Sequence, residues 1–143
     1  DGRKMSKSYN NAFQLTQSPD EVSKTLRAMP TDPARVRRTD PGDPAKCPVY
    51  SFHKLYSQPE DLRWAEEGCK SAGIGCGDCK KRLGERINEN MAKPFAAKQE
   101  LLSNPEKLDS LIADGCARAR KIAKQQLDQV KDWTGFKPSG DWV

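Results

Sequence analysis

Four cysteines in the middle of the chain constrain its fold more than any other feature. They follow the spacing C-x21-C-x6-C-x2-C, as Cys47, Cys69, Cys76 and Cys79. The close pair lets two sulfurs approach one centre, and the two single cysteines can complete a tetrahedral thiolate site. Zinc ribbons more often use two close pairs, whereas one pair with two single cysteines suits a 4Fe-4S cluster. We therefore expect a 4Fe-4S cluster, with zinc as the alternative.

Two interpretations without a metal compete with this one. Cysteine is often fully buried as a small apolar residue, so the four thiols could be unrelated core residues. Disulfides are less favoured, because no signal peptide is visible and five cysteines leave one unpaired. The fifth, Cys116, falls in an apolar stripe, and we expect it to be packed there rather than to bind a metal.

Composition sets the remaining bounds. A chain of 143 residues with 35% hydrophobic and 31% charged content is typical of one globular domain or slightly more, with a modest core. No apolar stretch is long enough to span a membrane, so we expect a cytoplasmic protein. The net charge of +5 and the pI of about 9.0 favour a polyanionic partner such as nucleic acid, although this charge alone is weak evidence.

Apolar periodicity predicts an all-α fold, a helical bundle stapled by the four-cysteine metal site. Ser18 begins the first helix, because Ser18-Pro19-Asp20-Glu21 is a capping box with proline at the first helical position. Pro30 ends it. Residues 30–48 contain five prolines and form a long irregular connector, for which Cys47 offers an anchor. Helical spacing resumes from Val49 and again over residues 62–69.

The metal site and the core share one helix in this prediction. Apolar and cysteine side chains recur there every three or four residues, at Cys76, Cys79, Leu83, Ile87 and Met91. Pro94 is expected to kink or restart this helix. Asn104 caps the final helix, whose broad apolar stripe runs from Leu108 to Val130 and includes Cys116.

The opening loop, Lys4-Met5-Ser6-Lys7-Ser8, has a different chemistry. Two lysines flank a serine in a segment preceded by glycine, which can bring positive charge onto a polyphosphate. Five residues match such a pattern easily by chance. Without further context, an inert surface loop or a disordered chain end explains them better.

Longer segments supply that context. Residues 1–11 resemble the KMSKS signature of class I aminoacyl-tRNA synthetases. Residues 37–44, 47–49, 53–55, 71–76 and 114–120 resemble bacterial tryptophanyl-tRNA synthetases, in the order of that family. The resemblance covers the chain from Asp1 to about Phe136.

The resemblance implies a function and a division of the chain. Residues 1–17 would be the KMSKS loop at the end of a catalytic domain, residues 18–136 a helical anticodon-binding domain, and residues 137–143 a flexible tail. The family joins tryptophan to its tRNA with ATP and magnesium, through tryptophanyl adenylate, and a homodimer is expected at full length. The Rossmann-type catalytic domain would precede Asp1, so we expect this chain alone to be inactive.

The resemblance also implies roles for individual residues. ATP would contact the loop residues Lys4, Met5, Ser6, Lys7 and Ser8, with Lys4 and Lys7 as catalytic residues. One branch of the family is described as holding a 4Fe-4S cluster near its anticodon-reading region on a pattern like C-x22-C-x6-C-x2-C, from which this chain differs by one residue in the first interval.

Basic residues beside the cysteines are candidates for contact with tRNA phosphates. They are Lys80, Lys81, Arg82 and Arg86. The alternative is that these cations only offset the negative charge of a thiolate site. Three hypotheses therefore remain open: a tRNA-binding part of a synthetase, a metal-stapled helical module that binds protein or RNA without catalysis, and an electron-transfer protein.

Overall fold

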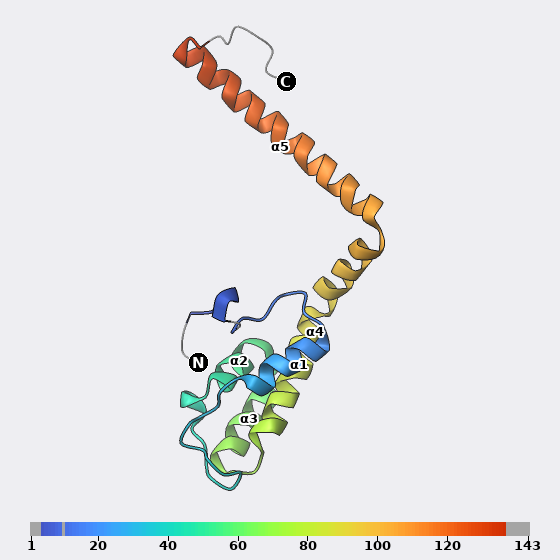
Figure 1. Cartoon of the computed structure of the whole chain (residues 1–143). Helices are drawn as coiled ribbons and strands as arrows, with labels where there is room; N and C mark the ends of the chain where they lie inside the picture. The colour runs from blue at the N-terminus through green and yellow to red at the C-terminus, as the bar shows by residue number, and fades with distance from the viewer. Residues whose placement is uncertain (1–3, 10, 137–143) are drawn as a thin grey trace. The chain divides into compact units, whose positions relative to one another are not determined.

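The computed structural model describes residues 4–9 and 11–136, and within them every regular element is helical. The all-α expectation is confirmed for this part of the chain. The elements, in order, are η1 Lys7–Tyr9, α1 Pro19–Ala28, η2 Pro44–Lys46, α2 Pro48–Tyr56, α3 Pro59–Lys70, α4 Cys76–Ser103 and α5 Pro105–Thr134 (Figure 1). The predicted tail, residues 137–143, lies outside the described residues.

Local signals in the sequence set most of the helix starts. A proline occupies the first turn of α1, α2, α3 and α5, where its missing N–H costs no hydrogen bond. The expected capping box is present, since the Ser18 hydroxyl accepts from the Glu21 N–H and the Glu21 carboxylate accepts from the Ser18 N–H. Asn104 caps α5 by accepting from the Lys107 N–H.

The helix that contains Pro94 does not restart there, and that part of the prediction is wrong. α4 runs without a break from Cys76 to Ser103 with Pro94 inside it. Proline removes a backbone donor and crowds the preceding turn, yet a helix can absorb this locally when the turns before it are held by packing. Leu83, Ile87 and Met91, in those turns, are all buried.

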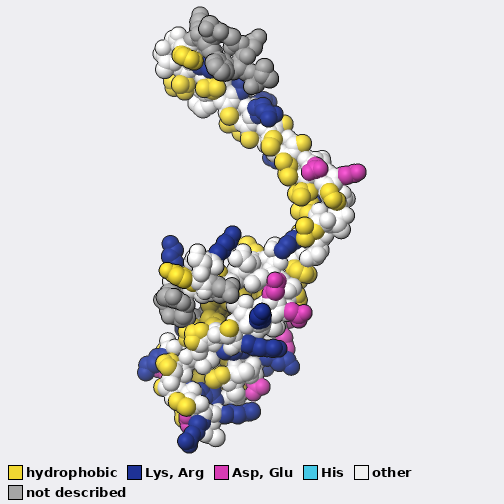
Figure 2. All heavy atoms as spheres, viewed as in Figure 1, with side chains coloured by type: hydrophobic (Ala, Val, Ile, Leu, Met, Phe, Trp, Pro, Cys, Tyr) yellow, Lys and Arg dark blue, Asp and Glu magenta, His cyan; other side chains and the backbone are white. Residues whose placement is uncertain are grey.

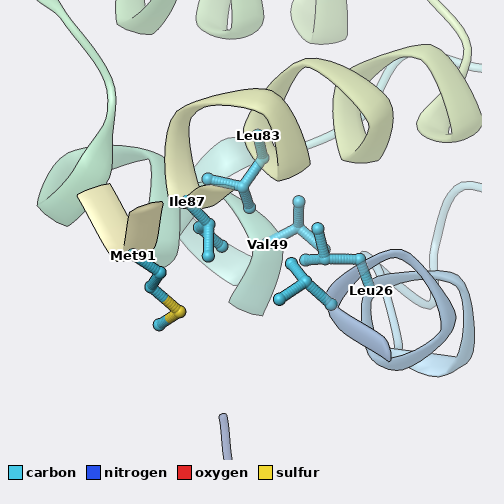
Figure 3. Packing of buried hydrophobic residues seen from close by; sticks show 6 residues of the cluster. Leu26, Val49, Leu83, Ile87 and Met91 are labelled. Atoms are coloured by element: carbon cyan, nitrogen blue, oxygen red, sulfur yellow. The ribbon is translucent and has the colours of Figure 1, made fainter. Parts of the chain in front are cut away.

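The chain divides into two compact units, Asp1–Lys98 and Gln99–Val143, with α4 beginning in the first and ending in the second. The core of the first unit is formed where α1, α2 and α4 meet. Figure 3 shows Leu26 of α1, Val49 of α2, and Leu83, Ile87 and Met91 of α4 converging there, and Val22 completes the cluster. Partly buried Cys47 and Cys79 pack against this core, so the predicted stripe of α4 does continue from the core as far as Cys79.

The second unit differs from its prediction. The apolar stripe of α5 is exposed, as Ile122 (67% exposed) and Leu111 (53%) illustrate. Cys116 is exposed as well, so the expectation that it is packed is wrong. An amphipathic stripe indicates which face a helix can bury, but burial needs a second element, and residues 99–136, the described part of this unit, offer α5 no such layer. Figure 2 shows hydrophobic side chains along this unit and many Lys and Arg side chains on the first.

Candidate functional site

The opening loop forms a small hydrogen-bonded turn with its lysines exposed. The Ser6 N–H donates to Asn11 Oδ1 at 2.8 Å, and Asn11 Nδ2 donates to the Lys4 carbonyl at 3.4 Å. The Ser8 N–H donates to Ser6 Oγ at 3.2 Å, and Lys7 begins the single turn η1. Both lysine side chains are exposed, so their charges are available to a ligand.

The four cysteines that lie far apart in sequence line one small cavity. Cys47 is the residue before α2, Cys69 lies in the last turn of α3, and Cys76 and Cys79 lie in the first turn of α4. The cavity has a volume of about 20 Å³, and Thr31, Arg35, Val49 and Ile74 complete its lining. The chain thus brings together the thiols that the spacing singled out.

Close backbone packing brings the connector to this cavity. The Gly42 N–H donates to the Cys69 carbonyl at 3.0 Å. A Cβ on residue 42 would lie 2.6 Å from Cys69 Sγ, so only glycine leaves room for the sulfur. Residues 71–75 form the turn between α3 and α4, with Ala72 at a positive φ of 57°.

The donor set fits a thiolate-bound metal by its chemistry but not by its present spacing. Four cysteine sulfurs around one cavity are the ligands that zinc and iron–sulfur clusters use. As they are placed, however, no group of three or more His, Cys, Asp or Glu side chains among the described residues could hold a metal ion. Metal binding would require the sulfurs to converge further, and the metal prediction stays a prediction.

Burial makes two of these thiols, Cys69 and Cys79, poor thiolates. It is the main cause that raises the pKa of Cys79 to about 12, and the neighbouring cysteines add to it. Burial also raises the pKa of Cys69, although the nearby Arg35 guanidinium works in the opposite direction. A cation that binds here must therefore displace protons, and metal affinity should rise with pH.

Arg35 is a buried cation beside the cysteines that the sequence analysis did not single out. Its side chain is 9% exposed, and its Nη1 lies 4.0 Å from Cys69 Sγ. Nη2 donates to the carbonyls of Arg38 at 2.9 Å and Ile74 at 2.6 Å, while the buried Nε has no hydrogen-bond partner. Such a group compensates negative charge that develops in the cavity.

His53 is a second residue beside the cysteines that no sequence pattern singled out for its chemistry. It is fully buried on α2, and its Nε2 lies 3.3 Å from both the carbonyl oxygen and the Sγ of Cys79. Its Nδ1 lies 2.7 Å from Ser57 Oγ, which fixes the ring. Burial lowers the pKa of His53, which favours the neutral imidazole.

The four basic candidates for tRNA contact have different surroundings. The Lys80 ammonium donates to the carbonyls of Arg27 at 2.9 Å and Met29 at 2.6 Å, which satisfies the C-terminus of α1. Lys81 is exposed. Arg82 and Arg86 are both bound by Asp61 of α3, which was not among the candidates.

The Asp61 carboxylate is fully buried and stays ionised, because two arginines form ion pairs with it. Its Oδ1 accepts from Arg82 Nε at 2.6 Å and its Oδ2 from Arg86 Nε at 2.5 Å. Burial alone would raise the pKa of Asp61, but the two arginines outweigh it and the pKa lies below its usual range. The Arg82 guanidinium also stacks over the Trp64 ring at 4.6 Å. These two arginines are therefore held rigidly on the surface of the first unit.

Comparison with known proteins places the chain in a class of enzymes. Residues 1–92 match the family model described as tRNA synthetases class I (W and Y). The chain belongs to this family of class I aminoacyl-tRNA synthetases. Within it, the chain resembles tryptophanyl-tRNA synthetase, since its relatives include tryptophan–tRNA ligases from Ralstonia nicotianae (44% identical, covering 95% of this chain and 34% of the relative) and Thermotoga maritima (41% identical, covering 92% and 40%).

A solved structure supports the same assignment. The crystal structure of tryptophanyl-tRNA synthetase from Campylobacter jejuni complexed with ADP and tryptophan matches with a TM-score of 0.83 and 28% sequence identity, covering 95% of this chain and 42% of that one. The chain thus spans about a third to two fifths of the length of the relatives it matches. Among the described residues, no helix has the length and apolar character needed to cross a membrane.

Proposed function

We propose that the chain is the part of a tryptophan–tRNA ligase that contributes the ATP-side KMSKS loop and recognises the tRNA anticodon. The observation that carries this proposal is the match of almost the whole chain to a tryptophan–tRNA ligase. In the complete reaction, the tryptophan carboxylate attacks the α-phosphorus of ATP and releases pyrophosphate. A ribose hydroxyl at the 3′ end of the tRNA then attacks the carbonyl carbon, giving tryptophanyl-tRNA and AMP.

The proposed role of the opening loop is electrostatic. Negative charge shifts toward the leaving pyrophosphate as the adenylate forms, and ammonium groups with magnesium stabilise that charge. Lys7 and Lys4 are the proposed catalytic residues, with Met5, Ser6 and Ser8 as the other ATP-side residues. The exposure of both lysines and the hydrogen bonds that hold the turn support this role.

The helical part of the first unit is proposed to bind the tRNA. Arg82 and Arg86 are fixed by Asp61, so they would contact phosphates with little further loss of side-chain entropy. Lys81 is exposed nearby, and Lys80 has two carbonyl partners that a phosphate would have to replace. The alternative, that these cations offset a negative thiolate site, stays open.

We further propose that Cys47, Cys69, Cys76 and Cys79 hold a 4Fe-4S cluster, with zinc as the alternative. Either metal centre would link the connector, α3 and α4 through bonds to the cysteine sulfurs. These bonds would add stability that a small apolar core does not supply by itself. The shared cavity and the buried Arg35 guanidinium beside it support this assignment. An electron-transfer role is not favoured, because the resemblance offers no redox partner.

Elemental analysis tests the metal proposal. The chain should be purified without oxygen, and iron, sulfide and zinc measured per molecule. About four iron and four sulfide would establish the cluster. One zinc per molecule would instead establish a structural zinc site and exclude the electron-transfer hypothesis, because zinc is not redox-active. Neither metal, in a folded chain, would show that the thiols are only core residues.

Two binding and activity assays test the ligase proposal. The chain alone should give no tryptophan-dependent exchange between ATP and pyrophosphate, because it spans only about a third to two fifths of the length of the relatives it matches. Fluorescence anisotropy should detect salt-sensitive binding of tRNA for tryptophan, weakened by anticodon changes. Exchange activity in the chain, or indifference to the anticodon, would contradict the respective part of the proposal.

A non-catalytic helical module that binds protein is the second candidate. The exposed apolar residues of α5 favour it, because an apolar stripe of this kind usually covers another protein surface. At full length, such a surface is also consistent with the proposed homodimer. Pull-down of one defined protein partner by a chain that ignores RNA would support this candidate over the first. A cytoplasmic setting suits both.

A further inference from the structure

A second cavity opens beside the start of α4, on the first unit. It has a volume of about 450 Å³ and is much larger than the cysteine cavity, with which it shares Thr31, Arg35 and Cys76. Three arginines line it against a single carboxylate: Arg35, Arg37 and Arg38 against Asp78. Neither Arg37 nor Arg38 was a predicted binding residue. The cavity is therefore lined mainly by positive charge, and Arg37 and Arg38 have no part in the functions proposed above.

The backbone at this cavity also favours an anion. α4 has 28 residues, and the N–H groups of its first turn have no carbonyl partners within the helix. Gly77, in this turn, is exposed, and a Cβ added to it would meet no atom within 4 Å. At Gly75, by contrast, a Cβ would lie 2.9 Å from Asp78 Oδ2 and 3.8 Å from Arg38 Cζ. The absence of a side chain at Gly77 thus leaves the mouth of the cavity open, and an anion could approach the backbone N–H groups there.

The buried side chain of Arg35 forms part of the wall of this cavity. Its hydrogen bonds to the carbonyls of Arg38 and Ile74 tie the arginine-bearing connector to the turn before α4. Its buried Nε–H has no partner. A buried, unpartnered donor on a cation is costly, and a nearby negative ligand reduces that cost. Arg35 thus adds uncompensated positive charge to the wall that this cavity shares with the cysteine cavity.

Asp78 limits how tightly a single anion can bind. Its Oδ2 accepts from the Gly75 N–H at 3.1 Å and lies 3.5 Å from Arg38 Nη2, in an exposed ion pair. Part of the positive charge is therefore already compensated. A ligand that contacts this cavity alone would bind weakly, and several contacts along one polyanion would be needed for useful affinity.

A neighbouring cavity supplies such contacts. It has a volume of about 230 Å³ and shares Gly77 with the 450 Å³ cavity. Its charged lining residues are Arg27, Lys80 and Lys81, with Glu85 as the one acidic residue. Basic side chains therefore lie on both sides of Gly77. A nucleic acid strand, which repeats its phosphates, matches two adjacent basic cavities better than one isolated phosphate does.

We propose that the first turn of α4, with Arg37 and Arg38, binds a phosphodiester of the tRNA backbone, and that the strand passes over Gly77 toward Lys81. This inference rests on the proposed tRNA-binding function and assigns it a phosphate site. The site positions the strand and carries no base specificity, so it acts alongside residues that read the bases.

Charge substitutions at Gly77 test the proposal, because the open space there avoids steric effects. Gly77→Asp should weaken binding of a labelled anticodon stem-loop of tryptophan tRNA by about tenfold at 50 mM salt, since a unit charge a few ångströms from a phosphate has this effect at a protein surface. Gly77→Lys should strengthen binding. Acidic residues are favourable in the first turn of a helix, so Gly77→Asp should fold normally.

Gly115 provides the matched control. It also lies in a helix with no atom within 4 Å of an added Cβ, so Gly115→Asp makes the same chemical change in α5. The affinity of that variant should differ from wild type by less than about twofold. Arg38→Gln should lower the slope of log affinity against log salt by about 0.7, as expected for one lost single-strand phosphate contact.

Each outcome discriminates between the proposals. If wild type binds the stem-loop but Gly77→Asp and Gly115→Asp bind it equally well, this phosphate site is wrong while the tRNA-binding function stands. If wild type does not bind the stem-loop, both proposals fail. If tripolyphosphate at the same phosphate concentration displaces the RNA completely, the site takes a free phosphate compound and not a strand.

Discussion

Replacing Asp61 with asparagine should destabilise the first unit strongly. The Asp61 carboxylate is 0% exposed and accepts short hydrogen bonds from Arg82 and Arg86, whose side chains are 37% and 26% exposed. Breaking a buried ion pair by removing one partner costs about 3–5 kcal/mol. Because both arginines can turn partly to water, we discount this to about 2 kcal/mol in the free energy of unfolding.

The pH dependence of this difference has a definite sign. The folded-state pKa of Asp61 lies below its usual range, so its contribution to stability is fully present above the unfolded pKa of about 3.9. The contribution is lost as the pH falls through the lower, folded pKa. The stability difference between wild type and Asp61→Asn should therefore be constant near neutrality and shrink below about pH 4.

Urea unfolding followed by far-UV circular dichroism measures this difference, with both proteins in the same metal state. Asp114→Asn is the matched control, because Asp114 forms an exposed ion pair with Arg118 at 2.9 Å. That substitution should change the free energy of unfolding by less than about 0.5 kcal/mol. Equal effects of the two substitutions, or a difference that grows as the pH falls from 7 to 3, would refute the reasoning.

Three further predictions concern the core, a helix cap and the cysteines. Leu83→Ala removes a fully buried side chain and should cost about 3 kcal/mol of unfolding free energy in urea titrations, whereas less than 1 kcal/mol would contradict its place in the core. Ser18→Ala removes the capping hydroxyl and should cost about 1 kcal/mol, and restoration by Ser18→Asp would identify the cap as the cause. Cys79→Ser should abolish stoichiometric metal binding measured by elemental analysis, whereas Cys116→Ser, at the exposed thiol, should leave the metal content unchanged. Equal metal content in both cysteine variants would exclude the four-cysteine site.

Short-range features of the sequence predicted the helices well because their causes are local. The capping box at Ser18, the cap at Asn104 and the prolines at helix starts act within a few residues. The stripe through Leu83, Ile87 and Met91 also identified the buried face of α4, since period and burial coincide there. Pro94 was the exception, because proline raises the cost of a helix without forbidding it.

The sequence by itself determined the helical class, the starts of α1 and α5, the four cysteines of the cavity and the resemblance to the family, whereas α3 begins at Pro59, three residues before the predicted segment. Only the tertiary structure decided which polar side chains contact one another. It places Arg35 beside Cys69, His53 against Cys79, and Asp61 between two arginines. Those contacts join residues from 21 to 34 positions apart, and no local pattern encodes them. The exposed stripe of α5 has the same cause, because amphipathicity is a property of one helix whereas burial requires a partner surface.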